Sequence, residues 1–119
     1  MKINYGIYFN DSFASISRIE GGNPCVVKSL DTQKKTTPLA VAFNKKGKTL
    51  VGDTAYRSYR SDSLKSLAKN APLNAFVEFN RTLGTNHLYY SSNIDKNFSS
   101  EELLGEVFKR LKEYVKDDV

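Results

Sequence analysis

Gly6-Ile7-Tyr8-Phe9-Asn10-Asp11-Ser12-Phe13-Ala14-Ser15-Ile16 is the stretch that decides how this chain folds. Residues 3–9, which lead into it, are rich in Ile, Tyr and Phe, and this composition is typical of a β-strand. Residues 10–13 interrupt the run with Asn, Asp and Ser, whose side chains hydrogen-bond the nearby backbone in turns. Apolar residues return between Ala14 and Glu20, so the stretch predicts a β-hairpin.

A second turn follows the hairpin at Gly21-Gly22-Asn23-Pro24. Glycine adopts positive φ without strain and proline restricts the exit of the turn, so this run is a strong turn signal. Residues 25–30 are then expected to form a third strand. The opening of the chain therefore predicts a three-strand antiparallel meander.

The middle of the chain predicts a second pair of strands and three short helices. Residues 39–43 are almost wholly apolar and predict a strand, residues 44–47 a turn, and residues 48–51 the returning strand. The helices are expected over residues 54–58 with Asp53 as N-cap, over residues 63–69 before Pro72, and over residues 74–83 with Asn74 as N-cap and Gly84 just beyond the end.

The last element is an amphipathic helix over residues 99–116. Ser99 and Glu102 have the spacing of a capping box, in which each side chain satisfies a backbone amide at the start of the helix. An apolar stripe with helical spacing follows, made of Leu104, Val107, Phe108, Leu111 and Val115. We expect this stripe to face the core rather than a membrane or a partner.

Composition limits the classes of function. The 119 residues allow one domain or a fragment of one, and the single Cys25, expected to be half-buried, excludes an internal disulfide. With one Cys and one His, the exposed loop residue His87, a metal site of those ligands is not expected. No secretory signal and no apolar run of about 20 residues occur, so we expect a soluble cytoplasmic protein.

The net charge of +5 is uneven. Residues 28–81 carry eleven Lys and Arg against four Asp and Glu, whereas residues 95–119 carry five against seven. A basic surface attracts nucleic acids or acidic partners. Because these lysines are scattered over turns, nucleic-acid binding ranks last among the functions considered.

Four segments, in order, resemble the opening of the nucleotide-binding domain of DnaK-type chaperones, the seventy-kilodalton heat-shock proteins. They cover nearly the whole chain. They are Tyr5-Gly6-Ile7 with Ser15-Ile16, Glu20-Gly21-Gly22-Asn23-Pro24-Cys25-Val26-Val27, Thr36-Thr37-Pro38-Leu39-Ala40-Val41-Ala42-Phe43 followed by Leu50-Val51-Gly52-Asp53-Thr54-Ala55, and Phe79-Asn80-Arg81-Thr82-Leu83-Gly84.

The resemblance implies an α/β fold, of which the part present here would be α+β. This part would be a partial first lobe of the actin-like, ribonuclease H-like ATPase fold. Within a single domain or fragment of 1–119, residues 1–38 would supply strands of the core lobe. Residues 39–98 would form a peripheral subdomain, and residues 99–116 the returning helix. The family binds ATP with Mg²⁺ between two lobes.

The resemblance also assigns the opening hairpin to the family's phosphate-binding turn. There, backbone amides and Thr hydroxyls bind phosphate, and an Asp organises hydrated Mg²⁺. The Asp position is Tyr8 and the Gly position is Asn10. The two Thr positions are Asp11 and Ser12, and the next Asn position is Phe13. Because the loop is only a weak, degenerate match to the family's motif, we predict that the isolated chain binds no cofactor and no metal.

A second departure falls at Asn80, which takes the position of the family's catalytic Lys, so no catalytic residue is predicted. Asp11 adds a repulsive charge: a carboxylate roughly 4 Å from a phosphate oxygen costs about 4 kcal/mol at an effective dielectric near 20. The simpler interpretation makes Asp11 a turn residue and Tyr8 a packed strand aromatic.

Three functions are compatible with these observations. The first is a DnaK-like fragment without ATPase activity that acts as a scaffold or interaction module, associating with itself or a partner protein through an unpaired sheet edge. The second is an ATP-binding chaperone domain truncated from a longer protein. The third is a basic nucleic-acid-binding module.

Overall fold

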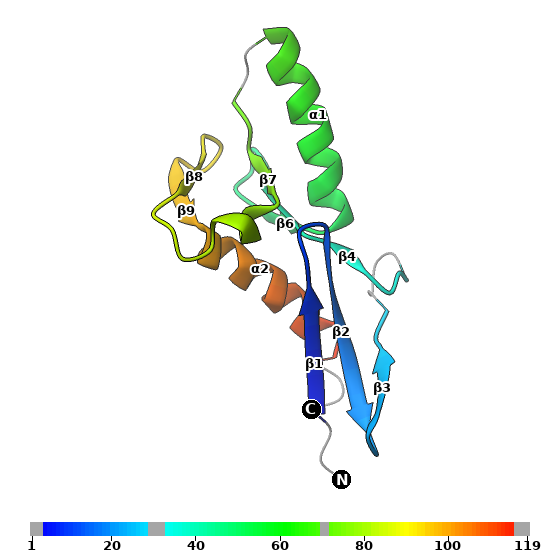
Figure 1. The fold of residues 1–119 in the computed structure, drawn as a ribbon. Coiled ribbons are helices and arrows are strands. Elements are labelled where there is room, and N and C mark those ends of the chain that lie inside the picture. The colour runs from blue at the N-terminus through cyan, green and yellow to red at the C-terminus, as the bar shows by residue number, and fades with distance from the viewer. Residues whose placement is uncertain (1–3, 29–32, 70–71, 116–119) are drawn as a thin grey trace.

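The computed structural model describes residues 4–28, 33–69 and 72–115. Over these residues the chain is a mixed α+β structure with antiparallel sheets and two α-helices, shown in Figure 1. No helix among the described residues is long and apolar enough to cross a membrane.

The first sheet is the predicted meander. β1 (Asn4–Phe9), β2 (Phe13–Glu20) and β3 (Asn23–Val26) are hydrogen-bonded in that order, and β4 (Thr37–Pro38) pairs with the start of β2. β3 ends at Val26, short of the predicted strand end at residue 30, and the last two predicted positions lie outside the described residues. Cys25 is exposed, so its predicted half-burial was wrong: β3 is exposed along its whole length.

The hairpin turn forms as predicted and for the predicted reason. The Oδ1 atom of Asn10 accepts hydrogen bonds from the amides of Ser12 and Phe13, at 2.8 and 2.9 Å. The amide of Asn10 in turn donates to the carbonyl of Phe13 at 2.9 Å. Phe9 consequently faces Ala14 across the strand pair, and Asp11 is carried at the tip.

The second sheet has the order β6-β5-β7, with β5 (Ala40–Phe43) fully buried at its centre. β6 (Thr49–Val51) is the predicted returning strand, joined to β5 through a turn in which Asn44 Oδ1 accepts from the amides of Lys46 and Lys48. β7 (Ala75–Val77) completes the sheet on the other side of β5.

β7 corrects the prediction of a helix over residues 74–83. Ala75 and Phe76 are buried, and they pair with β5. This strand pairing outweighs the local sequence pattern that predicted a helix. Glu78, with φ of 54°, ends the strand, and only a short 3-10 helix, η1 (Phe79–Thr82), follows. Gly84 does adopt positive φ, at 77°, as a residue beyond a helix end often does.

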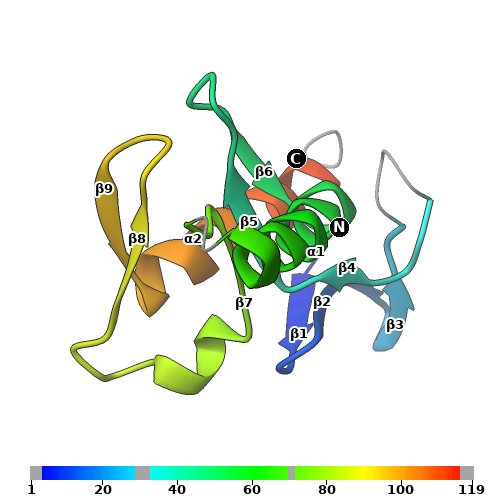
Figure 2. The same cartoon turned by 90° about the horizontal axis from the view of Figure 1, so that it is seen from above.

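α1 (Asp53–Lys69) is one continuous helix, whereas two short helices were predicted. No Gly or Pro interrupts the segment, so nothing in the backbone stops the helix between the two predicted pieces. Asp53 is its first residue rather than the residue before it. The helix packs on β5 and β7 and projects beyond the sheet, as Figures 1 and 2 show.

The C-terminal part contains a hairpin that the sequence analysis missed, β8 (Leu88–Ser91) with β9 (Lys96–Ser99). α2 (Ser100–Glu113) follows directly, and the capping box of Ser99 and Glu102 is confirmed. The predicted stripe faces the core: Leu104, Val107, Leu111 and Val115 are buried and Phe108 is partly buried.

α2 connects the parts of the molecule. It contacts β2 of the first sheet, β5 of the second sheet, and η1. Its buried residue Leu103, absent from the predicted stripe, belongs to the same core cluster as Ile16, Val41 and Phe79. This shared core holds the tip of the first hairpin beside η1.

Candidate functional site

The tip of the first hairpin and the short helix η1 meet through three side chains. The Nδ2 atom of Asn80 donates a hydrogen bond of 2.6 Å to Asp11 Oδ1. The Nε atom of Arg81 donates to the other carboxylate oxygen of Asp11 at 2.9 Å. Two consecutive residues of η1 therefore bind both oxygens of one carboxylate.

The backbone around η1 places these donors. Phe79 is fully buried in the core, so the residue just before Asn80 is fixed. Glu78 enters η1 in the left-handed region, an uncommon conformation for a residue with a side chain. Its Oε2 atom lies 3.6 Å from Arg81 Nη1, so Arg81 faces two carboxylates at once.

These contacts shift the pKa values of the two charged partners. The hydrogen bond from Asn80, followed by that from Arg81, holds the pKa of Asp11 below its ordinary value. The hydrogen bond to Asp11 raises the pKa of Arg81. Asp11 is consequently a carboxylate at neutral pH, and at the tip of the hairpin it is paired with the guanidinium group of Arg81.

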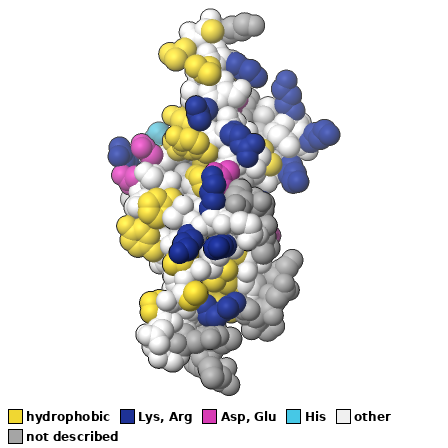
Figure 3. Space-filling view, turned by 90° about the vertical axis from the view of Figure 1, so that its right-hand side faces the viewer, with side chains coloured by type: hydrophobic (Ala, Val, Ile, Leu, Met, Phe, Trp, Pro, Cys, Tyr) yellow, Lys and Arg dark blue, Asp and Glu magenta, His cyan; other side chains and the backbone are white. Residues whose placement is uncertain are grey.

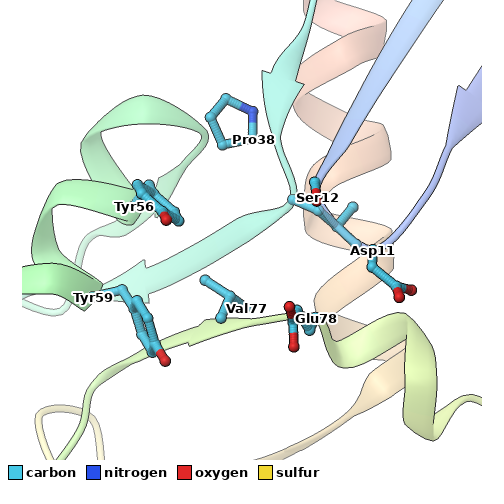
Figure 4. Close-up of a pocket in the computed structure, with 8 residues that line it drawn as sticks. Asp11, Ser12, Pro38, Tyr56, Tyr59, Val77 and Glu78 are labelled. Carbon is cyan, nitrogen blue, oxygen red and sulfur yellow. The ribbon is translucent and has the colours of Figure 1, made fainter. Parts of the chain in front are cut away.

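A cleft of about 440 Å³ opens beside this carboxylate, between the hairpin tip, β4, β7 and one face of α1 (Figure 4). The first hairpin and the start of η1 contribute polar side chains to its wall. α1 contributes two aromatic rings. The residues that line the cleft are Asp11, Ser12, Pro38, Leu39, Tyr56, Tyr59, Val77 and Glu78.

The structure brings together part of the predicted phosphate loop. Asp11 and Ser12 line the cleft, and Asp11 contacts Asn80. Asn10 acts as the turn residue and does not line the cleft. Tyr8 and Phe13 also lie outside the cleft lining, with their rings 5.9 Å apart. Tyr8 is 57% exposed, so the interpretation of a packed strand aromatic was wrong.

Three cleft-lining residues with aromatic or charged side chains were missed by the sequence analysis. Tyr56 and Tyr59 are one helical turn apart on α1, with ring centroids separated by 6.2 Å, and Glu78 lies at the far side of the cleft. The spacing of the two tyrosines is visible in the sequence. It was not recognised because α1 was divided into two short helices.

A second hollow, of about 300 Å³, lies between β1, β2 and α2 and is lined by Tyr5, Ile7, Ile16, Phe108, Lys112 and Val115. Its wall is almost entirely apolar, and Ile7 is 46% exposed there. β1 pairs only with β2 among the described residues, so its outer edge borders this groove without a strand partner in that part of the chain.

The sequence predicted no metal site and placed nucleic-acid binding last among the functions considered. Across residues 4–28, 33–69 and 72–115, no three His, Cys, Asp or Glu side chains gather closely enough to hold a metal ion. On the face shown in Figure 3, Lys and Arg side chains are spread along the length of the molecule and alternate with hydrophobic ones. His87 is exposed, as expected, with its ring against that of Tyr89.

Comparison with known proteins adds one relationship. No family model matches the chain. The chain is similar to the chaperone protein dnaK of Thalassiosira pseudonana, with 27% identity over 135 aligned positions. The alignment covers 96% of this chain and 22% of that protein, so the chain spans about a fifth of the length of the relative. The similarity indicates a distant relationship with DnaK-type chaperones.

Proposed function

We propose that this chain is a DnaK-related module that corresponds to the opening part of the nucleotide-binding domain, does not hydrolyse ATP, and acts through contacts with proteins. The similarity to dnaK over 96% of the chain supports the relationship. The three-strand meander, with a helix returning to the sheet, fits the first lobe of an actin-like fold.

The contact between Asp11 and the pair Asn80 and Arg81 carries the proposal. A phosphate group at the hairpin tip would meet the Asp11 carboxylate, already bound to Asn80 and Arg81, instead of free donors. The Asp11 carboxylate would repel a phosphate group placed close to it. The Asp11 carboxylate already accepts hydrogen bonds from Asn80 and Arg81. An incoming anion would therefore have to displace Asp11 to reach these donors.

Asn80 weakens the case for hydrolysis further. If its position matches that of the catalytic Lys, as the resemblance implies, the site lacks the cation that stabilises charge during phosphoryl transfer. The amide nitrogen of Asn80 is bound to Asp11, and its buried Oδ1 atom has no hydrogen-bond partner among the described residues. This side chain is committed to a contact within the protein.

The outer edge of β1 supports the interaction role. An unpaired strand edge can accept a further strand through backbone hydrogen bonds. Here the edge borders the apolar groove lined by Ile7, Phe108 and Val115. A second copy of the chain, or the lobe of a partner protein, would cover both the edge and the groove.

Nucleotide binding is tested by isothermal titration calorimetry with ATP and Mg²⁺, together with a phosphate-release assay. We expect no binding at micromolar ATP and no turnover. Micromolar binding would overturn the proposal and favour an ATP-binding chaperone domain that belongs to a longer protein.

Association is tested by size-exclusion chromatography with light scattering over a range of protein concentrations. We expect a concentration-dependent dimer that Ile7→Lys abolishes, because the charge would enter an apolar groove. Tyr90→Lys, at a similarly exposed strand residue outside the groove, should leave the dimer intact. A monomer at every concentration would count against self-association and leave a partner lobe as the occupant to test.

A further inference from the structure

We propose that the cleft beside Asp11 binds the guanidinium group of an arginine side chain presented by another protein. This inference rests on the proposed function, since it assigns a ligand to a site from which ATP phosphate is excluded. It replaces an anion with a cation as the expected occupant of the cleft.

The charge of the lining points to a cation. Asp11 and Glu78 line the cleft, and no Lys or Arg is among the residues that do. Arg81 lies against both carboxylates and neutralises only one of the two charges. A carboxylate has about four acceptor positions, so Glu78 can accept further hydrogen bonds after its contact with Arg81.

The aromatic wall selects a particular kind of cation. Tyr56 is 44% exposed and Tyr59 is partly buried, and in Figure 4 both rings stand across the cleft from Glu78, whereas the Asp11 carboxylate points away from them. The planar guanidinium group stacks on aromatic faces and pairs with carboxylates through two parallel hydrogen bonds. A cleft with rings on one side and the Glu78 carboxylate on the other matches both properties.

The surroundings limit how many charges the ligand carries. α1 also holds Arg57 and Arg60, neither of which lines the cleft. Each is next in sequence to one of the two lining tyrosines, so their positive charges disfavour a ligand with a run of basic residues. The cleft therefore fits a single arginine flanked by neutral or acidic residues. The volume of about 440 Å³ falls in the range of small-ligand sites.

The experiment titrates the full chain with a blocked Gly-Arg-Gly peptide and follows NMR signals. Ring protons of Tyr56 and Tyr59 should shift, and arginine side-chain protons of the peptide should move upfield as they enter the ring faces. The matched peptide has citrulline, a neutral isostere, in place of arginine. Equal shifts with both peptides, or no shift at Tyr56 and Tyr59, would overturn the proposal.

Two variants test the two walls separately. Tyr59→Leu and Glu78→Gln should each weaken binding of the arginine peptide by roughly five- to tenfold, the size of one cation–π or charge-assisted contact. Tyr90→Leu and Glu106→Gln change the same residue types outside the cleft and should leave affinity unchanged. If Tyr59→Leu fails to fold, Glu78→Gln decides, and unaltered affinity in that variant would contradict the assignment.

A separate titration with ATP and Mg²⁺ on the same sample distinguishes the two proposals. Nucleotide binding would refute the loss of the phosphate site. Failure of the arginine peptide to bind, with ATP also inert, would refute only the assignment of the cleft.

Discussion

Asp11 and Asn80, separated by 69 positions in sequence, are joined side chain to side chain by a hydrogen bond of 2.6 Å. The resemblance in sequence implied that each stands where the chaperone family has another residue, and the structure shows that the two side chains contact each other. One carboxylate takes up the amide of Asn80 and the guanidinium of Arg81. The Asp11 carboxylate therefore joins the hairpin tip to η1 and occupies the side-chain donors of Asn80 and Arg81.

Removing this anion should open the site to an external one. In Asp11→Ser, the donors of Asn80 and Arg81 lose their partner and the fixed negative charge disappears. We expect inorganic phosphate to bind this variant with millimolar affinity, measured by phosphorus NMR, and not to bind the parent chain. The double change Asp11→Ser with Arg81→Ala should lose the binding again. Equal phosphate affinity in the parent and in Asp11→Ser would show that Asp11 does not close the site.

Acid should destabilise the protein through two carboxylates. Asn80 and Arg81 lower the pKa of Asp11, and the amide of Gly84, at 2.8 Å, lowers that of Glu101. A depressed folded-state pKa gives stability that is complete above the unfolded value, near about 4, and is lost as pH falls through the folded value. Urea unfolding between neutral pH and pH 3 should show this decline.

The variants Asp11→Asn and Glu101→Gln cannot gain or lose that proton. Each should be less stable than the parent at neutral pH, and its stability should depend less steeply on pH in the acid range. An identical acid decline in the parent and both variants would assign the effect to other groups.

Two glycines should respond in opposite ways to alanine. Gly52 has φ of 85°, and a Cβ atom there would lie 3.0 Å from the side chain of Thr37. Gly105 lies inside α2, and a Cβ atom built there has nothing within 4 Å. Gly52→Ala should destabilise the fold by more than about 1 kcal/mol, and Gly105→Ala should stabilise it by roughly 0.5–1 kcal/mol. Thermal melts followed by circular dichroism measure both, and a stabilised Gly52→Ala would contradict the structure of this turn.

The capping box should contribute measurably to α2. The hydroxyl of Ser99 accepts from the amide of Glu102 at 3.2 Å, and Glu102 Oε1 accepts from the amide of Ser99 at 3.1 Å. Ser99→Ala should cost about 1 kcal/mol in chemical unfolding, whereas Ser99→Asp, which keeps an acceptor, should cost much less. Similar losses in both variants would mean that Ser99 acts through packing rather than as a cap.

The elements predicted correctly are those specified by residues close together in the chain. The turn at Asn10 and the capping box of Ser99 depend on side chains that bond the backbone two or three positions away. The apolar stripe of α2 follows from periodicity alone. Such features form wherever the local sequence allows them, so they can be derived before the fold is known.

Tertiary structure decided the remainder. Ala75, Phe76 and Val77 form a strand because β5 offers them backbone partners and a buried face, which no local rule includes. The same pairing ends at Val77, and the turn at Glu78 then sets Asn80 and Arg81 against the hairpin tip. By itself, the sequence determined that Asp11 would lie in a turn with an unfavourable charge for phosphate. Only the packing of η1 and α2 on the shared core determined which side chains that charge would bind, because long-range contacts arise from the fold as a whole.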